Sequence, residues 1–111
     1  MNTKAIFHID EEDKWPLLLG NVKNLLKEVN DAEIEVVANA VAVRGYIKSD
    51  NHLKVEMEGL AGRKVRFCAC QNSLRSLKVG KDDLFDFVVA VPAGVKEIVE
   101  RQRDGYAYIK P

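Results

Sequence analysis

The sequence predicts an α/β fold, a three-layer α/β/α sandwich in which helices cover a mostly parallel five-stranded sheet. Apolar, β-branched runs alternate with segments whose apolar residues recur every three or four positions, as on one face of a helix. No Asn-Gly turn joins consecutive strand candidates. Each strand is therefore expected to follow a crossover helix, and such crossovers give parallel sheets that are covered on both faces.

The strands are predicted from short runs of apolar and β-branched residues. They lie near residues 4–9, 33–39, 64–69, 86–91 and 106–109.

The helices are predicted from apolar spacing and from their end signals. The clearest helix begins near Trp15, directly after a run of acidic residues, and we expect Asn30 to end it in a left-handed conformation. A second helix is expected to end at Gly62, and at most two helical turns follow Cys70. The last helix begins after Pro92, with Gly105 as its C-terminal cap.

The composition is that of a folded chain with no excess of either charge. With 111 residues, 47% of them hydrophobic, we expect a single domain over residues 1–111. Seventeen basic and seventeen acidic residues give a formal net charge of zero, so neither nucleic acid nor an anionic membrane is an expected partner. No apolar run approaches the ~20 residues that span a bilayer, and the opening residues lack signal-peptide character. The expected location is cytoplasmic, with reduced thiols.

Function in an open parallel sheet is expected at the edge where the strands end, because helix N-termini and loop N–H groups converge there. This rule points to the residues at and just after the strand ends. Among them, His8, Asn39, Cys70, Asn72 and Gly94 are the candidate site residues.

Cys70 is the candidate reactive group. It ends a strand and precedes QNSL, where the unpaired N–H groups of a short helix favour a thiolate. The alternative is that Cys70 is a small buried residue that only packs. Cys68 lies two residues earlier on the same face of the strand, and we expect it to be packing.

The other candidates have structural alternatives. His8 could reach the site or simply bond a backbone group, and Asn39 could line the site or serve the turn after its strand. Asp10, Glu11 and Glu12 are explained by their place in front of a helix.

No cofactor or metal is expected. With His8 and His52 as the only histidines, the two cysteines do not have zinc-ligand spacing, and no Gly-rich phosphate motif occurs.

Three segments together resemble the DsrE/DsrF-like family of small intracellular sulfur-metabolism proteins. They are FCACQNSL at residues 67–74, the ending at residues 91–111, and KAIFHIDEEDKW at residues 4–15. The resemblance implies a five-stranded α/β/α fold and assembly into trimers or hexamers. It also implies a cysteine that accepts sulfur as a persulfide and passes it to a partner protein, and Cys70 matches that cysteine by position.

Two functions remain open. One is a sulfur-relay protein in which Cys70 takes sulfur from a donor protein and yields it to an acceptor protein. The other is a non-catalytic oligomer that binds a small ligand or has a regulatory role. Whether the chain is an enzyme by itself is not decided by the sequence. A homotrimer or homohexamer is expected, because a core of this size is expected to be too small for all the large aromatic residues: Trp15, Tyr46, Phe85, Tyr106 and Tyr108.

Overall fold

A single sheet of five parallel strands organises the computed structural model, which describes residues 2–111. The strand order is β4-β3-β2-β1-β5, so the chain moves outward from β1 to one edge and then returns to the other. The strands are β1 (Lys4–Ile9), β2 (Glu33–Ala38), β3 (Arg66–Cys70), β4 (Val88–Val91) and β5 (Ala107–Ile109). This confirms the α/β/α fold class and the five parallel strands predicted from the sequence.

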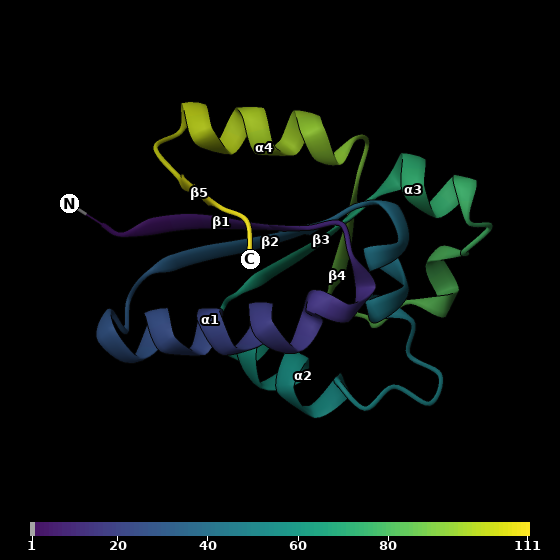
Figure 1. The fold of residues 1–111 in the computed structure, drawn as a ribbon, viewed down its shortest axis with the longest axis horizontal. Helices are drawn as coiled ribbons and strands as arrows, with labels where there is room; N and C mark the ends of the chain where they lie inside the picture. Colours follow the sequence, from purple (N-terminus) through teal and green to yellow (C-terminus); the bar gives the residue numbers. More distant parts are fainter. Residues whose placement is uncertain (1) are drawn as a thin grey trace.

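The helices divide unequally between the two faces of the sheet. Figure 1 shows α1 and α2 below the sheet and α4 above it. The helices are α1 (Trp15–Glu28), α2 (Lys54–Gly62), α3 (Gln71–Ser76) and α4 (Gly94–Arg103), and short 3-10 helices occupy Glu12–Lys14, Ala40–Tyr46 and Lys81–Asp83. None of the helices within residues 2–111 has the length and apolar character needed to cross a membrane.

The two faces of the sheet carry cores of very different size. The larger core lies between the sheet and the helices α1 and α2, and it contains most of the buried apolar residues. The smaller one lies under α4 and consists of Ile6, Val37, Cys68, Val91 and Ile98. Because a strand alternates its side chains between the two faces, the polar residues that share a face with this small core lie beside or under α4.

One sequence expectation about local structure is wrong. Asn30 does not end α1 in a left-handed conformation. Val29 is extended at φ −135°, and its N–H donates to the Leu25 carbonyl at 2.8 Å. The Ala32 N–H then donates to the Val29 carbonyl at 3.1 Å, so backbone bonds close this turn without a left-handed residue. Gly105, at φ 95°, does take the left-handed conformation predicted for it.

The core also holds more of the aromatic residues than the sequence suggested. Trp15, Tyr46 and Phe85 are all buried. The Trp15 and Tyr46 rings lie 5.0 Å apart, and Tyr46 packs edge-on against Phe67 at 6.1 Å. These three residues therefore give no reason to expect assembly, because the larger core already buries them.

Gly45 makes room for this aromatic packing. A Cβ atom at Gly45 would lie 2.0 Å from Nε1 of Trp15. Trp15 cannot move away easily, because it is buried and its Nε1–H donates to the Ala42 carbonyl at 2.9 Å. The close approach of the backbone to the indole thus requires glycine at this position.

We expect Gly45→Ala to lower the free energy of unfolding by about 2 kcal/mol or more, the usual cost of forcing atoms into a packed core. Gly20→Ala is the matched control. Apart from the adjoining residues and the helix's own backbone, no atom of residues 2–111 lies within 4 Å of a Cβ at Gly20, and alanine in a helix interior is favoured by up to about 1 kcal/mol. Urea denaturation of both variants measures the difference. Equal stability of Gly45→Ala and the wild type would contradict the packing described here.

Candidate functional site

Cys70 stands where β3 passes into α3. It is the last residue of the strand and the N-cap residue of the helix, with φ −67° and ψ 117°. Only 6% of its surface is exposed. The helix begins at Gln71, directly after the cysteine, so the backbone N–H groups of its first turn are close to the sulfur.

Gly94 brings α4 into contact with this point. A Cβ atom at Gly94 would lie 3.4 Å from the Cβ of Cys70 and 3.5 Å from the Cβ of Asn39. Asn39 follows Ala38, which is paired with Ala69, so Asn39 and Cys70 are neighbours at the ends of β2 and β3. The structure therefore brings together three of the five candidates that the sequence singled out.

The surroundings of the Cys70 sulfur favour its ionised form. Partial burial acts to raise the pKa of Cys70. Hydrogen bonds from the Ser73 hydroxyl and from the backbone N–H groups of Gly94, Ser73 and Asn72 outweigh this effect, and the pKa lies below that of an ordinary thiol. The Ser73 oxygen accepts a hydrogen bond from the Ala40 N–H at 2.7 Å, which leaves its own proton for the sulfur.

His8 joins the site through side chains instead of the backbone partner considered in the sequence analysis. Its Nε2 lies 3.0 Å from Oδ1 of Asn39, and its Nδ1 lies 2.7 Å from the hydroxyl of Tyr108. Tyr108 belongs to β5, His8 to β1, Asn39 follows β2 and Cys70 ends β3. These four residues form a row across neighbouring strands, on the face of the sheet that α4 covers.

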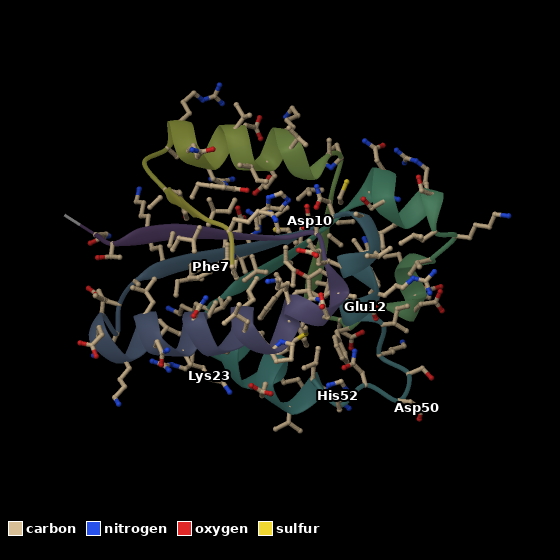
Figure 2. All side chains as sticks on the ribbon, in the orientation of Figure 1. Phe7, Asp10, Glu12, Lys23, Asp50 and His52 are labelled. Carbon is tan, nitrogen blue, oxygen red and sulfur yellow. The ribbon has the colours of Figure 1, made fainter. Side chains whose placement is uncertain are left out.

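Asn72 enters the site with its backbone only. Its N–H faces the Cys70 sulfur, while its side-chain oxygen accepts a hydrogen bond from Arg75 at 2.9 Å. Figure 2 shows Asp10 at the end of β1, at the carboxyl edge of the sheet, and His52 on the loop before α2, on the side of the sheet opposite α4. Asp10 pairs with Lys110 at 3.1 Å, and His52 is exposed.

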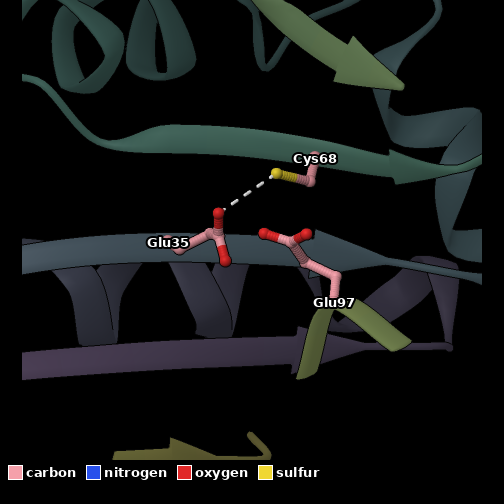
Figure 3. A group of neighbouring side chains, drawn as sticks. All are labelled: Glu35, Cys68 and Glu97. Carbon is pink, nitrogen blue, oxygen red and sulfur yellow. Dashed lines mark hydrogen bonds between the residues drawn. The ribbon is translucent and has the colours of Figure 1, made fainter. Parts of the chain in front are cut away.

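A second polar cluster lies deeper under α4. Figure 3 shows Glu35 of β2, Cys68 of β3 and Glu97 of α4 with their polar atoms facing one another. The Cys68 thiol donates to Oε1 of Glu35 at 3.5 Å. The other oxygen of Glu35 is buried and accepts no hydrogen bond from residues 2–111, although Nε of Arg101 lies 3.5 Å from it. Cys68 is fully buried, as expected for a residue that packs, but its thiol also contacts the carboxylate of Glu35. Burial, together with the charge of Glu35, raises the pKa of Cys68 far above its usual range.

Two arginines balance the two carboxylates of this cluster. Arg66 lies 3.2 Å from Glu35 and 3.8 Å from Glu97, and Arg101 lies 3.5 Å from Glu35 and 3.2 Å from Glu97. Burial is the largest influence on Glu35, and with the neighbouring Glu97 it raises the pKa of Glu35 to about 7. Burial also acts to raise the pKa of Glu97, but its bonds to Glu35 and Arg101 and the arginine charges lower it. The pair therefore holds one proton near neutral pH.

The same cluster is the group that comes nearest to metal-ligand geometry in residues 2–111. One ligand atom from each of Glu35, Cys68 and Glu97 lies within 4.8 Å of the others. A cation there would meet two guanidinium groups already bound to both carboxylates. Charge balance thus favours a structural role, in which the cluster fastens α4 to β2 and β3.

Sequence reasoning missed Ser73, Tyr108 and the two glutamates. The alternation of β2 held the signal for Glu35, since Glu35, Val37 and Asn39 point to the same face as Cys68 and Cys70. Ser73 stands three residues after the N-cap position, where capping interactions are common. Glu97 and Tyr108 could be located only once the position of α4 and the pairing of β5 were known.

Comparison with known proteins agrees with this fold. A model of the DsrE/DsrF-like family matches residues 48–111, which include Cys70 and Gly94. Protein MTH1491 of Methanobacterium thermoautotrophicum, whose function is unknown, is 40% identical with a TM-score of 0.92, over 99% of this chain and 100% of that one. The ychN protein of E. coli has a TM-score of 0.85 over 100% of both chains at 11% identity, a likeness of fold alone. None of the curated proteins compared with the chain matches it.

The charged cluster predicts a pH dependence of stability. Because folding raises the pKa of Glu35 from 4.5 to about 7, its neutral form stabilises the fold below pH 4.5, and this contribution is lost as pH rises through 7. The loss is on the order of 3 kcal/mol. The lowered pKa of Glu97 makes stability depend on pH only below pH 4.5, where Glu97 takes up its proton, and so it does not affect the range from pH 5 to 8.

Glu35→Gln keeps the shape of the side chain and cannot ionise. We expect its free energy of unfolding, followed by urea denaturation from pH 5 to 8, to change less with pH than that of the wild type. Asp10→Asn, at the exposed pair with Lys110, is the control. Parallel pH profiles for Glu35→Gln and the wild type would show that the buried pair does not hold the proton.

Proposed function

The chain belongs to the DsrE/DsrF-like family, and we propose that it is a sulfur-relay protein in which Cys70 carries sulfur as a persulfide. The proposal takes residues 1–111 as one domain of this family. Its expected place is the cytoplasm, where thiols stay reduced.

The observation that carries the proposal is the donor-rich surroundings of the Cys70 sulfur. Four donors face it: the Ser73 hydroxyl and the backbone N–H groups of Asn72, Ser73 and Gly94. A sulfur nucleophile reacts as the thiolate, and hydrogen bonds to the charged form increase its population at neutral pH. The same donors suit a persulfide, which also carries negative charge on sulfur.

The transfer needs no oxidant or reductant. The Cys70 thiolate attacks the outer sulfur of a donor persulfide, R–S–SH, and forms Cys70–S–SH while the S–S bond of the donor breaks. The bonding electron pair leaves with the donor sulfur as R–S⁻. A thiolate of the acceptor then attacks the outer sulfur on Cys70, and the Cys70 thiolate leaves. Ser73 and the backbone N–H groups stabilise the Cys70 thiolate, which attacks in the first step and leaves in the second.

A shallow apolar pocket beside Asn72 and Ser73 offers room for the carbon part of a thiol. Its volume is about 250 Å³, and it is lined by Ala40, Val41, Asn72, Ser73, Ser76 and Leu77. Asn72 and Ser73 are also the residues whose N–H groups face Cys70. A donor or acceptor group bound in this pocket would thus lie beside two of the residues whose N–H groups face the sulfur.

We expect incubation with a small persulfide donor to add one sulfur, ~32 Da, to Cys70 and none to Cys68. Mass spectrometry of alkylated peptides locates the added sulfur. Cys68→Ser keeps a hydroxyl that can donate to Glu35 and should load normally, whereas Cys70→Ser should not load. Loading of Cys68, or none at either cysteine of the folded wild type, would defeat the sulfur-relay proposal.

A non-catalytic oligomer that binds a small ligand at the same edge is the second candidate. The hydrogen-bond donors around Cys70 and the contact of Gly94 with Asn39 would also suit an anionic ligand.

For either function we propose a homotrimer or homohexamer, and light scattering tests this. Val95 and Val99, which are 65% and 58% exposed on successive turns of α4, are available for such contacts.

A further inference from the structure

The side chain of Asn39 is held in a fixed orientation that its own turn does not need. Asn39 is the N-cap of the 3-10 helix Ala40–Tyr46, is extended at φ −132° and ψ 179°, and makes no capping hydrogen bond with its side chain. The turn is closed instead by the Ala42 N–H, which donates to the Asn39 carbonyl at 3.2 Å. Ala40, at φ 51°, donates its N–H to the Ser73 hydroxyl at 2.7 Å. The amide of Asn39 is therefore free for another role.

His8 determines which way this amide points. The amide oxygen of Asn39 can only accept a hydrogen bond, so the Nε2 atom of His8, 3.0 Å away, must carry a proton. In the neutral ring Nδ1 is then an acceptor, and the Tyr108 hydroxyl at 2.7 Å donates to it. The hydroxyl of Tyr108 thus holds the ring of His8 from one side, and His8 holds the oxygen of Asn39 on the other.

The other arm of the amide lies on the side of Cys70. The oxygen of Asn39 faces β1, which pairs with one side of β2, whereas β3 and Cys70 lie on the other side. The amide is planar with its oxygen and its NH₂ on opposite arms, so the NH₂ turns away from His8. It makes no side-chain hydrogen bond in the described residues, and Cys70 is the neighbour of Asn39 in the register.

We propose that the Asn39 NH₂ group binds the negative charge of a small anionic sulfur ligand at Cys70, and that His8 and Tyr108 are positioning residues for it. This inference rests on the proposed function and names its substrate class, a sulfur anion such as a persulfide. The donors on the Cys70 sulfur come from α3 and α4, and Asn39 supplies one from the position directly after β2. Asn39 and His8 lie outside the range that the family model matches.

The test compares two alkylating reagents at Cys70, anionic iodoacetate and neutral iodoacetamide. A bound anion needs the NH₂ group and a neutral reagent does not, so the ratio of the two rates reports the anion subsite. In Asn39→Ala we expect the ratio to fall about tenfold or more, the range for a hydrogen bond to a charged group. Asn39→Asp keeps the acceptor toward His8 but replaces the NH₂ by a carboxylate oxygen, and the ratio should fall further.

Tyr108→Phe tests the positioning role. Tyr108 is 41% exposed and keeps its ring in this variant, so folding should be unchanged. Loss of its hydroxyl releases His8, and we expect the ratio to fall about twofold to tenfold, as for one neutral hydrogen bond. Tyr106→Phe is the matched control, because the Tyr106 ring lies over Lys4 and Arg101, away from His8, and its ratio should stay at the wild-type value.

The outcomes separate this inference from the proposed function. A protein whose Cys70 accepts sulfur, but whose rate ratio is the same in the wild type, Asn39→Ala and Asn39→Asp, would overturn the anion subsite and leave the sulfur relay intact. A ratio that falls in both Asn39 variants, without sulfur loading, would support the subsite in the ligand-binding oligomer. Equal ratios in Tyr108→Phe and the wild type would overturn the positioning role.

Discussion

The position of α4 on the sheet depends on a buried ionic cluster. Glu97 of α4 and Glu35 of β2 share two arginines, one from β3 and one from α4 itself. The apolar contact beneath α4 is small, centred on Ile98 and a few strand residues. The ionic cluster therefore holds the middle of the helix, and this fixes its first residue, Gly94, against Cys70 and Asn39. A displaced α4 would take away both the cover and one of the donors of the candidate site.

This arrangement gives two neighbouring cysteines opposite environments. Both face α4, because they are two residues apart on one strand. Cys68 lies in the buried interior beside a carboxylate, and both features oppose ionisation. Cys70 lies at the strand end, where a hydroxyl and several N–H groups face its sulfur and favour ionisation. The carboxyl edge of the sheet thus separates a thiol that packs from a thiol that can react.

The fold followed from the sequence more closely than the site did. Apolar alternation and helical spacing predicted the strands and the crossover helices, because burial on a sheet or a helix face leaves a periodic trace. The strand-end rule placed Cys70, Asn39, His8 and Gly94 at one edge. The links between them depend on contacts far apart in the chain, such as His8 with Tyr108 at a separation of 100 residues, and no local pattern encodes such a pair.

The buried ionic cluster shows the same limit. Glu35 looks like a surface residue in a strand of alternating character, and Glu97 like any charge on a helix. Only the crossing of α4 over β2 and β3 brings them together. The aromatic residues failed as a guide for a related reason, since the close approach at Gly45 lets the core accommodate Trp15.

Cys70 ionises far more readily than Cys68. The most direct measurement of this difference is the ultraviolet absorbance of the thiolate as a function of pH, in Cys68→Ser, where only Cys70 titrates, and in Cys70→Ser, where only Cys68 does. We expect a midpoint for Cys70 below the usual value of a free thiol, and no titration of Cys68 while the protein remains folded. Equal midpoints in the two variants, or a midpoint for Cys70 above that of a free thiol, would contradict it.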